Sequence, residues 1–432
     1  MKIGKKLRKV HDYITSSYYI SDKNLNLNGS KWNDVVLLSL ITGLTNGRQL
    51  FLGIPGTGKT TAAEIAISLL YGREPGFVQF CTVYGTRDST EEKILGRPHF
   101  GKLSLGEEEV VWSSFSKSLD SKIVDEISRI PEGGQSILLN SIGRGIFKYL
   151  NGILYYQGPF LATTNYPDKG THPLIPPLLD RFDISVECTP SVGSTFLYES
   201  AEENKQFLID ERIRREMIRS LEENDFEKLN ELKEEYRTKL EENGIPTFND
   251  EEISKFKEVH KNIKFDGESE LLLAVFFDDV NAITKTPEDS SKMIMERYKN
   301  FPAGRIENNL SYRFLNSVKK YCKAIALALN EEKVDPEILR VVMPYTLTHR
   351  ITVSDEYIQK NLKDEFYPGS QKQYVSKEIV NDFFRDFLEK KHIYKEFYSA
   401  AANKDYETMK KLAEEYDLPS IRAVYYRKTY SK

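Results

Sequence analysis

The chain has 432 residues, enough for two or three domains, and a formal net charge of −4. Its 40% of apolar and 29% of charged residues are typical of a soluble globular protein and give no overall case for nucleic-acid binding, although a local basic patch stays open. No apolar run approaches the roughly 20 residues that cross a membrane, and the basic residues 1–10 precede no long apolar segment. We therefore expect neither membrane insertion nor a signal peptide.

The three cysteines, Cys81, Cys188 and Cys322, are scattered along the chain. Their spacing fits neither a disulfide framework nor a zinc site. We therefore expect buried, reduced thiols in a cytoplasmic protein.

The first part of the chain predicts an α/β domain. Residues 1–45 have a helical pattern and end in the apolar run Val35–Leu44. From Leu50 to Glu187, short apolar runs alternate with helical stretches, which is typical of a parallel sheet with crossover helices.

Residues Gly53–Thr60 carry the most informative motif, Gly-Ile-Pro-Gly-Thr-Gly-Lys-Thr, which lies between an apolar strand and a helix. Its glycines let backbone N–H groups converge on a phosphate, and the helix N-terminus adds a positive dipole. Lys59 would bring its charge to the β- and γ-phosphates of a nucleotide, and Thr60 would bring its hydroxyl to Mg²⁺. The predicted nucleotide-binding residues are Gly53, Pro55, Gly56, Thr57, Gly58, Lys59, Thr60 and Thr61.

Two later strand ends supply groups for hydrolysis. Asp125 and Glu126 follow a short apolar stretch, although the polar residues 120–122 interrupt the start of that strand. Asp125 can hold Mg²⁺ together with Thr60, and Glu126 can act as the general base that polarises the attacking water. Asn165 ends a second apolar strand, where its amide can orient the water or contact the γ-phosphate.

Two arginines are candidates for contacts to the γ-phosphate. Arg181 ends a short helix, where its guanidinium would reach the nucleotide of a neighbouring subunit and stabilise charge on the transferring phosphoryl group. Arg313 opens an apolar helix and could reach the γ-phosphate from a lid.

Two β-hairpins are predicted between these strands. Asn151-Gly152, flanked by apolar and aromatic residues, is the strongest short signal for a hairpin. Residues 96–112 are a second candidate. The first hairpin carries Lys148 close to an apolar tip formed by Leu150 and Ile153.

The order of these elements resembles that of MoxR-type AAA+ ATPases. Asp125–Pro131 reads Asp-Glu-Ile-Ser-Arg-Ile-Pro, similar to the acidic motif of that family, although Ser128 replaces the usual asparagine. Ala162–Asn165 matches sensor 1, Leu179–Phe182 matches the arginine-finger motif, and Ser311–Arg313 looks like sensor 2.

This resemblance implies an α/β fold, with an AAA+ P-loop NTPase core on a parallel sheet, an all-helical lid and extra C-terminal helices. We expect the core over residues 1–190, the lid over 191–355 and a helical extension over 356–432. The lid would include a charged helical insertion at 205–243 without a counterpart in the family, and we expect this insertion to be an exposed arm.

The resemblance also implies Mg²⁺-dependent ATP hydrolysis in a homo-oligomer, most simply a hexameric ring, because Arg181 can act only across a subunit interface. It implies a chaperone-like remodeller whose partner typically has a von Willebrand factor A domain. The intact Asp125 and Glu126 argue against a scaffold that binds nucleotide without hydrolysing it. The alternative is a motor that translocates nucleic acid, in which Lys148 touches the strand and the basic aromatic tail 421–432 binds phosphates and bases.

Overall fold

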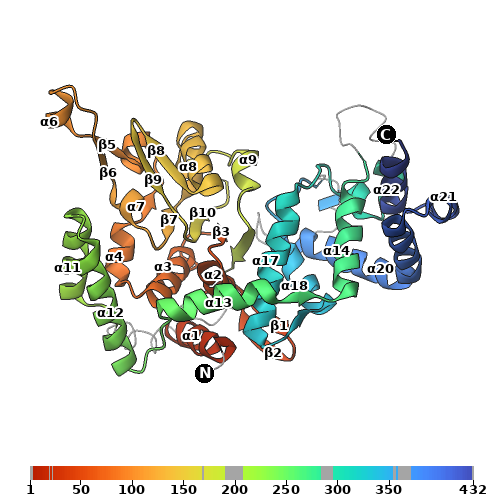
Figure 1. Cartoon of the computed structure of the whole chain (residues 1–432), viewed down its shortest axis with the longest axis horizontal. Coiled ribbons are helices and arrows are strands. Elements are labelled where there is room, and N and C mark those ends of the chain that lie inside the picture. The colour runs from red at the N-terminus through yellow and green to blue at the C-terminus, as the bar shows by residue number, and fades with distance from the viewer. Residues whose placement is uncertain are drawn as a thin grey trace. The chain divides into compact units, whose positions relative to one another are not determined.

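The computed structural model describes residues 3–18, 20–21, 23–167, 170–189, 208–283, 295–353, 357–358 and 371–430. The chain forms two compact units (Figure 1). The first comprises Met1–Asn262 with Leu327–Asn330, and the second comprises Ile263–Ala326 with Glu331–Lys432. None of the described helices is long and apolar enough to span a membrane.

A five-stranded parallel sheet forms the centre of the first unit, in the order β11-β3-β10-β7-β4. The strands are β3 Arg48–Gly53, β4 Val83–Tyr84, β7 Lys122–Asp125, β10 Phe160–Thr164 and β11 Ile184–Cys188. The predicted α/β fold is confirmed. Because the strands are parallel, the carboxyl ends of β3, β7 and β10 meet at one edge of the sheet, which is where ligands bind in open α/β sheets.

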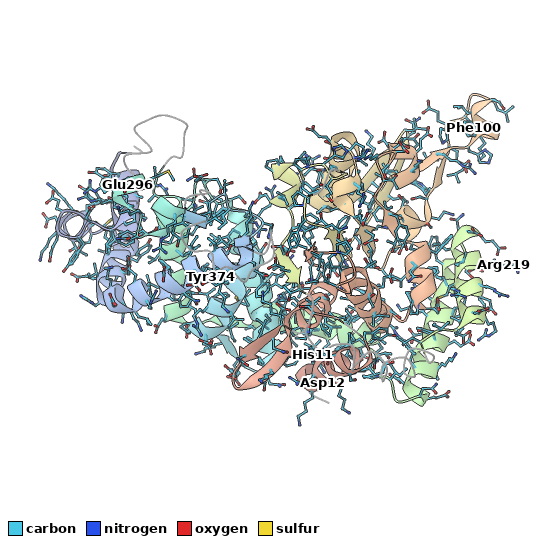
Figure 2. All side chains as sticks on the ribbon, turned by 180° about the vertical axis from the view of Figure 1, so that it is seen from behind. His11, Asp12, Phe100, Arg219, Glu296 and Tyr374 are labelled. Carbon is cyan, nitrogen blue, oxygen red and sulfur yellow. The ribbon has the colours of Figure 1, made fainter. Side chains whose placement is uncertain are left out.

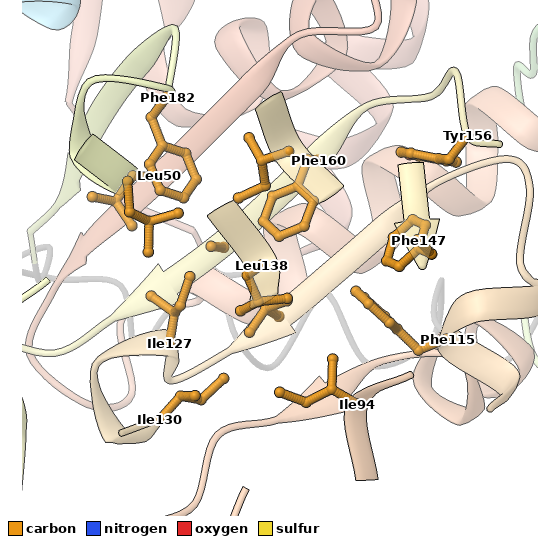
Figure 3. Packing of buried hydrophobic residues seen from close by; sticks show 14 of the residues in the cluster. Leu50, Ile94, Phe115, Ile127, Ile130, Leu138, Phe147, Tyr156, Phe160 and Phe182 are labelled. Carbon is orange, nitrogen blue, oxygen red and sulfur yellow. The ribbon is translucent and has the colours of Figure 1, made fainter. Parts of the chain in front are cut away.

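Helices accompany this sheet, and some of them pack on it. In the first unit they are α1 Ile3–Ser17, α2 Asp34–Leu44, α3 Lys59–Tyr71, α4 Pro75–Phe80, α5 Glu91–Ile94, α6 Phe100–Leu103, α7 Ser114–Lys117, the 3₁₀ turn η1 Ile127–Arg129, α8 Glu132–Arg144, α9 Pro176–Leu179, α11 Glu211–Glu222, α12 Phe226–Glu242 and α13 Asp250–Asn262. Helices α2 and α3 contact each other and β3. Leu138 and Ile142 of α8 pack with Leu50, Val124 and Phe160 of the sheet (Figure 3). This core fixes the strand ends that carry the predicted site.

Both predicted hairpins are present, and a third lies near the N-terminus. Their strands are β1 Asn24–Leu27 with β2 Ser30–Asn33, β5 Gly96–Pro98 with β6 Val110–Trp112, and β8 Ile146–Tyr149 with β9 Gly152–Tyr155. The turn of β8–β9 differs from the expected Asn-Gly turn by one residue. Tyr149 pairs with Gly152, so Leu150 and Asn151 form the turn, and Leu150 has a φ of 47°. Gly152 is required for packing instead, because a Cβ atom there would lie 2.7 Å from Cζ2 of Trp112.

The charged segment at 205–243 is not an exposed arm, and that prediction is wrong. Residues 205–207 lie outside the described residues, but α11 and α12 pack on each other, and α11 contacts α4 and α7. Tyr236 of α12 is fully buried. Arg73 donates from Nη1 to the carbonyl oxygen of Leu229 over 2.9 Å. The charges therefore mark the outer face of two amphipathic helices whose other face is buried in the first unit.

The second unit is mainly helical in the described residues. Its elements are β12 Lys264–Phe265, α14 Gly267–Val280, α16 Pro302–Arg305, α17 Tyr312–Leu329, β13 Lys333–Val334, α18 Pro336–Leu347, α20 Gln371–Asn403, α21 Tyr406–Glu415 and α22 Pro419–Tyr430. Aromatic rings hold its helices together, because Phe276 of α14 lies 5.0 Å from Phe383 of α20 and 5.9 Å from Phe314 of α17, measured between ring centroids. The predicted C-terminal helices are thus present, while the division into a lid at 191–355 and an extension at 356–432 stays a prediction.

Candidate active site

The motif at residues 53–60 forms the loop between β3 and α3. Gly56 and Gly58 have φ values of 80° and 75°, in the left-handed region that favours glycine. Gly53 lies so close to β11 that a Cβ atom would be 2.3 Å from the carbonyl oxygen of Cys188. The other predicted binding residues lie in this loop or in the first turn of α3: Pro55, Thr57, Thr60 and Thr61. The helix therefore starts directly behind a tightly wrapped loop, as an anion site requires.

Lys59 is the first residue of α3, and its side chain folds back over the loop. Nζ donates to the carbonyl oxygens of Gly53 over 3.0 Å and Ile54 over 2.7 Å. Burial lowers the pKa of this ammonium group, and the nearby charges of Asp125 and Glu126 act in the opposite direction. These two bonds use two of the three N–H donors of the ammonium group, so one donor remains for an anionic ligand.

Asp125, at the carboxyl end of β7, joins three parts of the site. Its Oδ1 accepts from Thr60 Oγ1 over 2.6 Å and from Thr163 Oγ1 over 2.5 Å. Thr163 was not predicted from the sequence. The parallel register pairs Ala162 of β10 with Val124 of β7, and this brings the next residue of β10 beside Asp125. The sequence signal that could have indicated Thr163 is a hydroxyl side chain within an apolar strand; that strand, β10, is fully buried in the structure.

Glu126 follows in a left-handed conformation with φ 52° and ψ 49°. Its N–H donates to Thr163 Oγ1 over 2.9 Å, and its Oε1 accepts from Asn165 Nδ2 over 2.9 Å. Its Oε2 forms an ion pair with Arg129, which the sequence did not predict as a site residue. The turn fits closely against Gly85, where a Cβ atom would lie 2.1 Å from the carbonyl oxygen of Glu126. Strained backbone of this kind costs about 1–3 kcal/mol and clusters at functional sites.

Glu64 is a third carboxyl group near the site, and it was also missed from the sequence. It lies on α3 and is 7% exposed, and its Oε2 accepts from Gln79 Nε2 over 3.0 Å. Burial raises the pKa of Glu64 to about 7, the bond from Gln79 opposes that shift, and the charge of Asp125 adds to it.

Of the two predicted arginines, Arg181 lies outside this cluster in the first unit, and Arg313 belongs to the second unit. Arg181 follows α9, donates from Nη1 to the carbonyl oxygen of Pro177 over 3.2 Å, and packs against α8 where a Cβ atom on Gly143 would be 2.3 Å from its Nε. Arg313 is an exposed residue in α17 of the second unit, and its N–H donates to Ser311 Oγ over 3.3 Å. The structure thus brings together Lys59, the two carboxylates and the amide of Asn165, but it does not add Arg181 to that cluster.

Comparisons with known proteins agree with this geometry. Residues 49–182 match the family model of the AAA domain, dynein-related subfamily. That stretch contains the 53–60 loop, the acidic pair, Asn165, Arg181 and both predicted hairpins. No curated protein sequence matches the chain.

Two solved structures are similar to the chain. A crystal structure described as that of a candidate ATPase from Cytophaga hutchinsonii is 17% identical, with a TM-score of 0.58, and the match covers 89% of this chain and 94% of that one. A full-length MCM homolog from Methanopyrus kandleri is 13% identical, with a TM-score of 0.42, covering 81% of this chain and 61% of that one. The family match and the first structure place the fold in the AAA+ class.

Proposed function

We propose that this AAA+ protein hydrolyses ATP with Mg²⁺ and couples hydrolysis to the remodelling of a protein partner. The observation that carries the proposal is a continuous line of hydrogen bonds that starts at Thr60, passes through Asp125 and ends at Asn165. It joins the helix behind the phosphate loop to the two strand ends, which are the parts that phosphoryl transfer to water requires.

Phosphate binding would fall to residues 53–61, where loop N–H groups and the remaining donor of Lys59 can meet the phosphate oxygens. Thr60 Oγ1 and Asp125 Oδ1 lie 2.6 Å apart and fit Mg²⁺, which takes oxygen ligands and is commonly held by one or two side chains plus substrate phosphates. No larger cluster of metal-binding side chains occurs among the described residues. When bound, Mg²⁺ would neutralise charge on the phosphates.

Glu126 would act as the general base. Asn165 holds its Oε1 and Arg129 pairs with its Oε2, so the carboxylate is oriented at both oxygens while each keeps a further lone pair. The carboxylate would accept a proton as the water oxygen forms its bond to the γ-phosphorus, and the bond to the ADP oxygen breaks.

Arg181 supports assembly into a ring. Arg181 follows α9 and bonds to the carbonyl oxygen of Pro177, outside the cluster around Asp125, so within one subunit it would not reach the γ-phosphate. In our proposal the Arg181 of a neighbouring copy reaches it instead, in a homo-oligomer that is most simply a hexamer. Arg313 would reach the nucleotide from the lid.

The two hairpins support a protein rather than a nucleic acid as the partner. Large apolar side chains are exposed on both of them: Phe100, Leu103, Leu105, Val111, Leu150, Ile153 and Tyr155. Phe100 lies on the part of the β5–β6 hairpin that projects from the sheet (Figure 2). The tip residues 100–109 carry one lysine and three glutamates, which disfavours phosphates. Exposed apolar surface of this kind is typical of protein contacts.

The basic tail also argues against nucleic acid. Arg427 donates to the carbonyl oxygen of Asn281, and Lys428 donates to that of Ala401 over 3.1 Å. Arg422 forms an ion pair with Asp417. These cations are used within the second unit, two of them at helix carboxyl ends, where positive charge is favoured. We therefore keep the MoxR-type assignment, with a partner that carries a von Willebrand factor A domain, as our proposal. The three buried free thiols fit a cytoplasmic location.

Two variants test the hydrolysis. Lys59→Ala should lose ATP binding and turnover together, whereas Glu126→Gln should bind ATP normally and lose turnover by more than about 100-fold. Calorimetric ATP binding and a phosphate-release assay separate these outcomes. Near-normal turnover by Glu126→Gln would remove Glu126 as the base.

The partner class is tested with wild-type protein and two probes, single-stranded DNA and reduced, amidomethylated lysozyme as an unfolded polypeptide. At about 0.15 M salt we expect the polypeptide to stimulate ATP turnover and the DNA to have no effect. Leu105→Ser should reduce the stimulation without changing the basal rate. Stimulation by DNA that is lost in Lys148→Ala would replace the remodeller with the nucleic-acid motor.

A further inference from the structure

Lys122 is fully buried at the amino end of β7, the end opposite to Asp125. Its Nζ donates to the carbonyl oxygens of Phe115 and Ser118 and, over 3.2 Å, to that of Ser116. All three N–H donors of the ammonium group are therefore satisfied by backbone at the carboxyl end of α7.

Three aromatic rings enclose the same ammonium group. Nζ lies 5.2 Å from the ring centroid of Phe115, 5.0 Å from that of Phe147 and 4.7 Å from that of Tyr156. Phe147 belongs to β8 and Tyr156 follows β9, so two of the rings come from the base of the β8–β9 hairpin (Figure 3). A desolvated cation attracts ring faces, so the ammonium group draws the hairpin towards β7.

The main chain of Lys122 is fixed as well. Its N–H donates to the carbonyl oxygen of Pro159 over 3.0 Å, and the residue pairs with Phe160 of β10. An aliphatic side chain would fill the same space without the cost of burying a charge. The ammonium group alone offers three directed bonds to α7 together with attraction to the rings of the hairpin.

We propose that Lys122 is a positioning residue that fixes the base of the β8–β9 hairpin against β7, so that the hairpin and the strand ending in Asp125 move as one body. A displacement of the apolar hairpin tip then reaches the ring faces at Lys122 and passes along β7 to the acidic pair. This inference goes beyond the proposed function, because it assigns a mechanical link that needs no particular partner.

The link should respond to pH. Burial lowers the pKa of Lys122 to about 7, and the neighbouring Cys81 and Asp120 act in the opposite direction. Burial raises the pKa of Cys81 to about 12 and that of Tyr156 far above its ordinary range, and Asp120 is paired with Arg73. Of these groups that face the ammonium group, Lys122 therefore changes charge near neutral pH. Opening of the hairpin exposes Lys122 to water, where its pKa is higher, and so takes up a proton; opening should therefore become less favourable as the pH rises above 7.

Hydrogen exchange of the full chain, followed by mass spectrometry, tests the link. In Lys122→Met, exchange in peptides covering residues 146–156 should rise roughly fivefold at pH 6.5, while peptides from α1 and α13 stay unchanged. Wild-type exchange in the hairpin, corrected for the intrinsic pH dependence, should fall between pH 6.5 and 8.5, and that fall should be absent in the variant. Lys93→Met removes an exposed lysine of the same unit and should behave like wild type.

A second readout is kinetic and rests on the proposed ATPase. Lys122→Met should lower kcat for ATP about tenfold with an unchanged KM, because the phosphate loop is untouched. If wild type lacks ATPase activity, the proposed function is wrong, but hydrogen exchange still tests whether Lys122 fixes the hairpin.

Two exchange results would overturn the link: hairpin exchange equal to wild type, or a rise that is uniform over the first unit. If Lys122→Met does not fold, Phe147→Leu removes one ring face with little loss of apolar volume. Phe147→Leu should also raise hydrogen exchange in residues 146–156, by a smaller factor than Lys122→Met. If exchange there does not rise in Phe147→Leu, the proposal is overturned as well.

Discussion

Two lysines are buried at opposite ends of the central sheet, and their surroundings differ. Lys59 lies at the carboxyl end, where it donates to two carbonyls of its own loop beside the charges of Asp125 and Glu126. Lys122 lies at the amino end, where three carbonyls and three rings surround it. Burial lowers the pKa of both.

The two lysines differ in whether a ligand can replace their hydrogen-bond acceptors. The bonds of Lys59 leave one donor unused, and phosphate oxygens can replace the loop carbonyls at modest cost, because one hydrogen bond to a charged group is traded for another. Lys122 has every donor engaged and is enclosed by side chains of other elements. We infer that the carboxyl end of the sheet is a ligand site and the amino end a fixed joint, and four predictions test this comparison.

The first prediction is that the carboxyl end is incomplete in a single subunit. Arg181→Ala should bind ATP and lose turnover by about 10³-fold or more, because an arginine supplied in trans contributes that much to phosphoryl transfer. Mixing Arg181→Ala with Lys59→Ala should restore part of the activity, since mixed rings contain some sites with both groups intact. An unaffected rate, or a monomeric active species by light scattering, would count against the assignment.

The second prediction concerns the hydroxyl that links the two strand ends. Thr163→Val removes one bond to Asp125 and one to the N–H of Glu126. Bonds to charged groups are worth about 1.5–3 kcal/mol, so kcat should fall roughly 10- to 100-fold with ATP binding retained. Thr82→Val, which loses a hydroxyl bonded to the Val78 carbonyl, is the matched control and should change kcat little. Equal kcat values for the two variants would deny Thr163 its role.

The ligand end of the sheet could largely be predicted from the sequence. The phosphate loop is a local motif, and parallel pairing alone brings the ends of β7 and β10 beside it. Thr163 and Arg129 escaped prediction, because the first depends on the strand register and the second on the left-handed turn at Glu126. Both are set by tertiary packing rather than by local pattern.

The joint could not be predicted. In the sequence Lys122 is a polar residue that weakens a strand, and only the folded hairpin shows why a cation is tolerated there. The segment at 205–243 failed for a related reason. Its charges suggested an exposed arm. An amphipathic helix, however, has the same composition whether its apolar face contacts a partner or the core of its own protein. Here Tyr236 lies on an apolar face that is buried in the core of the first unit.

The third prediction uses the pH dependence of stability at the joint. The pKa of Lys122 falls from 10.5 to about 7 on burial, so the unfolded chain binds more protons between these pH values and stability rises with pH there. From pH 7 to 9 the free energy of unfolding of wild type should therefore gain about 2.3 kcal/mol on Lys122→Met, because the full slope of about 1.4 kcal/mol per pH unit is reached only above the folded pKa. Urea unfolding followed by Trp112 emission in a Trp32→Phe background measures this. If the difference in the free energy of unfolding between wild type and Lys122→Met does not change with pH, the buried ammonium group keeps an ordinary pKa.

The fourth prediction takes the opposite sign at the ligand end. The pKa of Glu64 rises from 4.5 to about 7, so the folded chain binds more protons between these values and stability falls as the pH rises through that window. Glu64→Gln removes this loss and keeps the contact to Gln79. Between pH 5 and 6 its free energy of unfolding should gain about 1.2 kcal/mol on wild type, and above about pH 8 the difference should stay constant. The same urea titrations test it, with Glu92→Gln on the surface as a control that should show no such gain. The two buried groups titrate near the same pH with opposite slopes. If the change of slope in the double variant equals the sum of the changes in the two single variants, the two ends of the sheet carry their charges independently.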